Sequence, residues 1–186
     1  TTVASSFQLY QELGLRGEVN FPAFEQALKG FSRYASGQDR LLVLIDYTKP
    51  STEKRFYILD LLQKKLLLST YVAHGRGSGD NYAVAFSNRP GSYQSSLGFF
   101  RTGDTYMGKN GYSLFLDGLE KGINDKARER AIVVHGANYA DPAVLKGQQR
   151  LGRSLGCPAL PPDISKQVID TIKGGVLLYI YGLNKA

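Results

Sequence analysis

Residues 41–45 read Leu-Leu-Val-Leu-Ile, the longest aliphatic run in the chain. Because no polar residue alternates with these side chains, the run predicts a strand that is buried on both faces. Residues 55–62 and 66–73 follow it and flank a polar turn at residues 63–65. Two such segments around a short turn predict a β-hairpin. The sequence from 41 to 73 therefore predicts the first three strands of a sheet.

Helices are expected on either side of this region. Residues 5–13 predict a short helix, and Asn20 is the expected N-cap of a second helix that has Pro22 in its first turn. Asp163 is the expected N-cap of a late helix over residues 164–172. Further short strands are expected at residues 83–86, 97–102, 112–116, 131–134 and 176–181.

The order of these elements predicts the fold class. Helices come first, short strands follow and one helix comes late, which favours an α+β fold with a mostly antiparallel sheet over a doubly wound parallel sheet. Residues 46–50, which follow the first predicted strand, also lack the glycine fingerprint of a dinucleotide-binding fold. We expect a single domain over residues 1–186, with residues 1–37 as a helical segment packed on it.

The charge of the chain is strongly basic. It carries 23 Lys and Arg residues against 16 Asp and Glu residues, a formal net charge of +7. This sign favours polyanions as a class, such as nucleic acid, anionic lipid or an acidic wall polymer. The basic residues are nevertheless spread along the chain, with no block longer than two. We therefore expect a solvated basic surface and no nucleic-acid partner.

The sequence contains neither a membrane-span pattern nor a zinc motif. The longest aliphatic run is far shorter than the roughly 20 residues that a membrane-spanning helix needs. The chain begins Thr1-Thr2-Val3 without a charged region that leads into an apolar one, so no signal peptide is visible. One cysteine and two histidines supply at most three soft ligands. We therefore expect no structural zinc site.

Two segments have residue types that suit nucleophilic catalysis. His135 follows the strand predicted at residues 131–134, and Cys157 lies 22 positions later in a glycine-rich loop. A thiol becomes a good nucleophile when an imidazole takes its proton, and consecutive backbone N–H groups at Leu155, Gly156 and Cys157 would stabilise an oxyanion. The alternative for a lone cysteine is an inert, buried, small apolar side chain.

These two segments also carry a family resemblance. Residues 130–137 read Arg-Ala-Ile-Val-Val-His-Gly-Ala, and residues 150–160 read Arg-Leu-Gly-Arg-Ser-Leu-Gly-Cys-Pro-Ala-Leu. In this order they resemble the catalytic domain of murein L,D-transpeptidases, the YkuD-like cysteine transpeptidases. Shorter matching motifs lie upstream, at residues 86–88, 91–92, 95–98 and 122–125. The resemblance extends over residues 21–183.

The resemblance implies peptidoglycan chemistry. In this family the thiol that matches Cys157 attacks the carbonyl between the third and fourth residues of a stem tetrapeptide, and D-Ala leaves from a thioester. The imidazole that matches His135 acts as the general base, and the backbone of residues 155–157 holds the oxyanion. Transfer to an amine gives a 3-3 cross-link, and transfer to water gives carboxypeptidase activity. The resemblance further implies a cell-envelope, periplasmic or secreted location, no cofactor, and stem peptides as the partner; we expect a monomer.

The chain departs from the better-known form of the family at three places, one of which is Pro158-Ala159, where that form often has a polar residue soon after the thiol. Leu155 stands where that form has histidine, and Gly136 follows His135 where that form often has serine. Four further residues are candidates for substrate binding, each with a structural alternative such as fixing a loop or capping a turn. They are Ser154, Arg153, His74 and Gly136.

Two other functions remain open at this stage. The first is a non-catalytic, cationic module that binds the cell wall on the same fold. The second is a metal hydrolase that uses His74, His135 and Cys157, which has the minimum of three ligands but no His-Glu-x-x-His motif.

Overall fold

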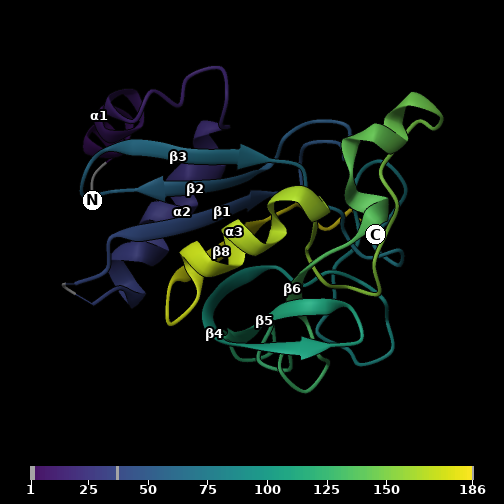
Figure 1. Cartoon of the computed structure of the whole chain (residues 1–186). Helices are drawn as coiled ribbons and strands as arrows, with labels where there is room; N and C mark the ends of the chain where they lie inside the picture. The colour runs from purple at the N-terminus through teal and green to yellow at the C-terminus, as the bar shows by residue number, and fades with distance from the viewer. Residues whose placement is uncertain (1–2, 37, 186) are drawn as a thin grey trace.

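The computed structural model describes residues 3–36 and 38–185, and Figure 1 shows its course. The helices are α1 (Val3–Glu12), α2 (Phe21–Tyr34) and α3 (Pro162–Ile172), with two short 3-10 helices, η1 (Asn138–Ala140) and η2 (Pro142–Lys146). The strands are β1 (Leu41–Asp46), β2 (Phe56–Asp60), β3 (Lys65–Thr70), β4 (Gly98–Gly108), β5 (Gly111–Gly118), β6 (Val133–Gly136), β7 (Ala159–Leu160) and β8 (Leu177–Tyr181). Residues 1, 2, 37 and 186, which the expected domain and segment limits include, lie outside the described residues.

The strands form one mixed sheet in the order β3-β2-β1-β8-β4-β5-β6-β7. Most neighbours are antiparallel, whereas β1 with β8 and β6 with β7 are parallel. The expected α+β class with a mostly antiparallel sheet is confirmed. Helices α1 and α2 precede the sheet and α3 comes late, as the sequence predicts.

Helices cover both faces of the β1 region, which explains its uninterrupted aliphatic sequence (Figure 1). Leu42 and Leu44 pack in a core with Phe24 and Leu28 of α2. Val43, which lies between them on the strand, packs in a second core with the apolar side chains of α3. Since successive side chains of a strand point to opposite faces, burial on both sides requires an apolar residue at every position.

The helix starts differ in detail from the expectation. Asn20 does occupy the N-cap of α2, but its side chain donates to Asp46 Oδ2 at 2.7 Å and makes no capping bond. Helix α3 begins at Pro162 with Pro161 as its N-cap, so Asp163 lies inside the first turn. The expectation for Asp163 is therefore wrong by two positions. A carboxylate in the first turn still interacts favourably with the helix dipole.

Several strand predictions need correction. Residues 83–86 form no strand, because they lie in the long segment of loops and turns that precedes β4. Strand β6 begins at Val133 rather than at residue 131, since Ala131 has a left-handed backbone with φ +56°. The two-residue strand β7 was not expected at all. The hairpin of β2 and β3 is confirmed, as are the strands at β1 and β8.

In the described part of the chain, no helix has the length and apolar character needed to cross a membrane.

Candidate active site

A cavity of about 330 Å³ opens beside β6, and its walls include the residues that precede this strand, the loop before Cys157 and the turn that joins β4 to β5. We call it the thiol cavity. Its lining residues are Lys109, Asn110, Arg130, Ala131, Ile132, His135, Tyr139, Arg153, Ser154, Leu155 and Cys157. The fold therefore brings His135 and Cys157 to one cavity.

Backbone pairing fixes the positions of the two side chains. Strand β7, which begins two residues after Cys157, pairs with β6 so that Ala159 lies opposite His135. On its other side Ala159 pairs with Ala73 in an antiparallel bridge, and Gly75 pairs with Ser154. The thiol loop is thus held between two segments of main chain.

The thiol of Cys157 is nearly buried, with 9% of the residue exposed. Its Sγ donates to the carbonyl oxygen of Ala131 at 3.3 Å and accepts from the backbone N–H of Val133 at 3.4 Å. Burial raises the pKa of the thiol, while the Val133 N–H and the charges of Arg130 and Lys109 oppose that rise. The resting group is therefore a protonated thiol, because burial disfavours the charged form.

His135 is also buried, with 3% exposed, and its ring is oriented by the backbone. Nδ1 lies 2.9 Å from the carbonyl oxygen of Gly136, which can only accept. Nδ1 therefore carries the hydrogen and Nε2 is the acceptor. Burial lowers the pKa of His135, which the bond to Gly136 partly offsets, so the ring is neutral at pH 7. Among the described residues no hydrogen bond joins this ring to the Cys157 thiol.

Ser154 fixes the loop through its own hydroxyl. The hydroxyl donates to the carbonyl oxygen of Cys157 at 2.6 Å and accepts from the N–H of Gly156 at 3.1 Å. Gly156 has φ +126°, a conformation that disfavours any residue with a Cβ. Of the three N–H groups expected to hold an oxyanion, that of Gly156 is thus engaged inside the loop. Leu155 is 51% exposed at the mouth of the cavity.

Arg153 lies on the thiol cavity, but its guanidinium has partners of its own. Nη1 lies 3.1 Å from Asp80 Oδ1 and also donates weakly to the carbonyl oxygens of Arg76 and Gly79. Asp80 is exposed, so this ion pair is open to water and to a competing anion.

The structure does not bring His74 to the thiol cavity. Its ring is fully buried, and Nδ1 lies 2.9 Å from Nη2 of Arg55. Because arginine can only donate, Nδ1 of His74 accepts and Nε2 donates to the carbonyl oxygen of Gly79 at 3.2 Å. Burial and the neighbouring Arg55 lower the pKa of His74 to about 3. This ring ties together the segment that supports the thiol loop.

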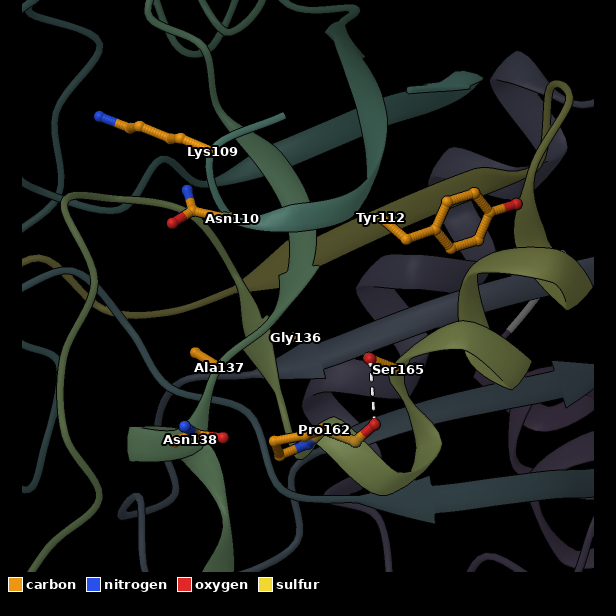
Figure 2. Close-up of a pocket in the computed structure, with 8 residues that line it drawn as sticks. All are labelled: Lys109, Asn110, Tyr112, Gly136, Ala137, Asn138, Pro162 and Ser165. Atoms are coloured by element: carbon orange, nitrogen blue, oxygen red, sulfur yellow. Dashed lines mark hydrogen bonds between the residues drawn. The ribbon is translucent and has the colours of Figure 1, made fainter. Parts of the chain in front are cut away.

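Gly136 belongs to a second cavity, of about 370 Å³, on the other side of β6. Figure 2 shows its walls, with Lys109 and Asn110 at the β4–β5 turn, the end of β6, and Pro162 and Ser165 on α3. A Cβ at Gly136 would lie 2.5 Å from Oγ of Ser165, so only glycine lets α3 pack this closely. Lys109 and Asn110 line both cavities.

Two cations of the thiol cavity, Lys109 and Arg130, are not predicted from the sequence. Arg130 is part of the motif that carries the resemblance, but nothing in its spacing assigns it a role. Lys109 lies in a turn whose position over the cavity depends on the length of β4 and β5, which the sequence underestimates.

No group of three or more His, Cys, Asp or Glu residues is placed to hold a metal ion within residues 3–36 and 38–185. His74, which the metal-hydrolase hypothesis requires, has both ring nitrogens engaged by protein groups.

Comparison with known families matches residues 15–181 to the L,D-transpeptidase catalytic domain. The chain belongs to this family. The match begins after α1, includes α2, the whole sheet and α3, and ends at the last residue of β8. It confirms the resemblance that residues 130–137 and 150–160 carry, and it makes this chain a member of an enzymatic family.

Several solved structures align with this chain at low sequence identity. The helical cell shape determining protein Pgp2 from Campylobacter jejuni (K307A mutant) aligns with a TM-score of 0.51 at 16% identity, over 80% of this chain and 49% of that one. An L,D-transpeptidase from Mycobacterium smegmatis aligns with a TM-score of 0.47 at 13% identity, over 77% of this chain and 59% of that one. An L,D-transpeptidase from Stackebrandtia nassauensis aligns with a TM-score of 0.47 at 14% identity, over 98% and 78% of the two chains.

The chain spans less than two thirds of the length of the Campylobacter and Mycobacterium proteins. The comparison with curated proteins finds no match.

Proposed function

We propose that this L,D-transpeptidase domain is a cysteine acyl-transfer enzyme that acts on peptidoglycan stem tetrapeptides. One observation supports the proposal best. Cys157 and His135, far apart in sequence, line one cavity, and the Gly136 carbonyl holds the imidazole by Nδ1 so that Nε2 remains to accept a proton. A neutral, oriented imidazole beside a thiol is the arrangement that nucleophilic catalysis requires.

In the first half-reaction, the thiol of Cys157 exchanges its bond to the Ala131 carbonyl for a bond to Nε2 of His135. Nε2 accepts the thiol proton, and the thiolate attacks the carbonyl carbon between the third and fourth residues of the stem. The C–N bond of the tetrahedral intermediate then breaks. His135 returns the proton to the leaving amine of D-Ala, and the acyl group stays on Cys157 as a thioester.

In the second half-reaction, an amine of another stem attacks the thioester. Nε2 of His135 takes a proton from the attacking nitrogen, and Sγ leaves as a thiolate that regains this proton. The product is a 3-3 cross-link. Water in place of the amine gives a tripeptide, and this is the carboxypeptidase reaction.

The oxyanion site is the backbone of the thiol loop. The N–H of Gly156 already donates to Ser154 Oγ, so the N–H groups of Leu155 and Cys157 are the donors that we assign to the tetrahedral oxygen. The bond from Ser154 then serves to hold the loop in the shape that aims these two groups.

The charge of the site suits an anionic substrate. Lys109, Arg130 and Arg153 line the thiol cavity, and no carboxylate among the described residues does. Stem peptides carry free carboxylates, which such a cavity attracts. A peptidoglycan substrate places the working protein in the cell envelope or outside the cell, and nothing in the reaction requires more than one copy of the chain or a cofactor.

The test is mass spectrometry of purified disaccharide-tetrapeptide after incubation with the wild-type chain and with Cys157→Ser. We expect a cross-linked dimer or a tripeptide product from the wild type and at least a thousandfold less from the variant, since removing a nucleophile costs on the order of 10³-fold or more. Circular dichroism checks that the variant keeps its fold. Product from both proteins would contradict the assignment of Cys157 as the nucleophile. Retention on insoluble peptidoglycan without product from either supports the wall-binding alternative.

A further inference from the structure

Arg130 is the cation of the thiol cavity that the protein holds most firmly. Its Nη1 donates to the Ser87 carbonyl and to Ser96 Oγ, both at 2.8 Å. Its Nη2 donates to the Gln94 carbonyl at 2.8 Å and to Ser92 Oγ at 3.2 Å. Four bonds fix the plane and the position of the guanidinium.

None of these four acceptors carries a charge. Within the described residues Arg130 makes no ion pair, unlike Arg153, Arg128 and Arg101. The guanidinium stays protonated at any working pH. The protein thus holds a positive charge without a counter-ion in a half-buried position, where hydrogen bonds to neutral groups offset the cost of burying it.

The charge lies beside the thiol loop. A Cβ at Gly156, the residue before Cys157, would be 3.5 Å from Nη2 of Arg130. Arg130 also directly precedes Ala131, whose carbonyl accepts the bond from the resting thiol. Both Arg130 and Cys157 line the thiol cavity.

The thiolate needs such a charge, because its other surroundings disfavour it. Burial raises the pKa of Cys157, and the Ala131 carbonyl bonds to the protonated thiol only. One backbone N–H, that of Val133, and the positive charges oppose these effects. His135 cannot supply a charge before it has taken the thiol proton, since its ring is neutral.

We propose that Arg130 is the fixed positive charge that stabilises the Cys157 thiolate, both when it forms and when it leaves the thioester. Lys109 contributes less, because it is exposed on a turn and so is solvated by water. The inference rests on the proposed function for the role of the thiolate, but its test does not.

Several other titratable groups face the thiol or its loop and also contribute to the electrostatic environment of the thiol. They are His135, Tyr139, Arg153 and Lys109 on the cavity, and Tyr47, whose phenol is buried near the thiol loop.

The test is the rate of alkylation of the folded chain by iodoacetamide between pH 5 and pH 10. Cys157 is the sole cysteine, so the rate reports this thiol alone. We expect Arg130→Gln to raise the thiol pKa by about one unit or more and to slow alkylation at pH 7 by about tenfold, while the limiting rate at high pH stays within about twofold. Arg130→Lys, which keeps the charge, retains most of the reactivity.

Two matched controls separate charge from scaffolding. Arg128→Gln removes a nearby exposed arginine that pairs with Asp117, and Ser96→Ala removes one acceptor of the guanidinium while keeping its charge. Both should leave the thiol pKa unchanged. A fall in alkylation at every pH without a shift in the thiol pKa would mean that Arg130 only holds the loop, and the inference would be wrong.

If Arg130→Gln does not fold, Arg130→Lys decides the question. Lysine keeps the positive charge but not the four hydrogen bonds of the guanidinium. A charge effect therefore predicts that Arg130→Lys has a lower Tm and a thiol pKa within about half a unit of the wild type. Loop-holding predicts instead that this variant loses alkylation equally at every pH. The alkylation assay uses no peptidoglycan, so its result does not depend on the proposed substrate. A shifted thiol pKa in a chain that makes no product would overturn the proposed function alone, and product with an unshifted thiol pKa would overturn this inference alone.

Discussion

The imidazole of His135 donates from Nδ1 to the carbonyl oxygen of Gly136, the next residue on the same strand, at 2.9 Å. The orienting group is therefore part of the main chain and needs no third catalytic side chain. A carbonyl holds the ring and fixes its tautomer but adds no negative charge. Burial then dominates and lowers the pKa of His135.

The lowered pKa of His135 predicts where the reaction rate falls at acid pH. The general base must be neutral, and the ring becomes protonated only below its folded-state pKa, which lies below the usual 6.5. We expect kcat/KM on disaccharide-tetrapeptide to fall with a midpoint below pH 6.5. A pH profile of kcat/KM measures this midpoint. A midpoint above pH 6.5 would contradict a neutral, buried base.

Replacing the imidazole should separate the base from the nucleophile. His135→Ala removes the proton acceptor, so we expect turnover at pH 7 to fall by about 10²- to 10⁴-fold, the usual contribution of a general base. Iodoacetamide should still alkylate Cys157 at pH 10, where solvent takes the thiol proton. Parallel kinetic and alkylation measurements check this. Loss of alkylation at every pH would instead assign His135 to holding the loop.

The site residues differ in how far the sequence could predict them. The glycine-rich thiol loop and the His-Gly strand end carry local patterns, and these gave Cys157 and His135. The contacts of Arg130 come from residues 87–96. Because this segment has no regular periodicity, no local pattern in the sequence predicts these contacts. His74 was expected as a candidate for substrate binding, yet its burial depends on Arg55, 19 positions away.

The strands of the fold also differ in how far the sequence could predict them. The aliphatic run at residues 41–45 predicts burial on both faces because every position must be apolar there, and the two cores confirm it. Strand β7 has only two residues and exists because β6 and Ala73 flank it, so its own sequence carries no strand signal. Residues 83–86 have a strand-like composition but no neighbouring strand to pair with in the described chain.

The close packing of Gly136 against α3 makes a stability prediction. Gly136→Ala places a Cβ 2.5 Å from Ser165 Oγ, and we expect a loss of about 1–3 kcal/mol in the free energy of unfolding, as for other overpacked sites. Turnover should fall too, because relief of the clash moves the end of β6 that carries His135. Urea denaturation and kinetic assays measure both effects.

Two variants control this prediction. Gly147→Ala has no atom within 4 Å of the new Cβ, so its stability should change by less than about 0.5 kcal/mol. Adding Ser165→Gly to Gly136→Ala removes both close atoms of Ser165 and should restore turnover. No recovery in the double variant would rule out this clash as the cause.

The buried ring of His74 predicts acid sensitivity of the fold. Its folded-state pKa is about 3, against 6.5 in the unfolded chain. Below pH 6.5 the unfolded chain binds a proton that the folded chain does not bind until about pH 3, so stability falls as the pH falls through this window. The slope from one such group is at most about 1.4 kcal/mol per pH unit.

Urea denaturation at pH 7.5, 6 and 5 measures this slope. His135 adds a contribution of the same sign, so the useful quantity is the difference between the wild type and His74→Gln. We expect a shallower decline with acid for the variant. Equal slopes in the two proteins would show that His74 does not titrate in this window.

Strand β7 lies between two partners, β6 on one side and Ala73 on the other. Ala73 and Ala159 exchange a pair of main-chain bonds, at 2.8 and 3.2 Å, and the carbonyls of Pro158 and Leu160 accept from the backbone N–H groups of His135 and Ala137. The spacing of thiol and imidazole is therefore set by peptide groups. Only a local opening that parts these peptide groups lets the amide protons of residues 73 and 159 exchange with deuterium, so their exchange rates measure how often the reactive pair comes apart.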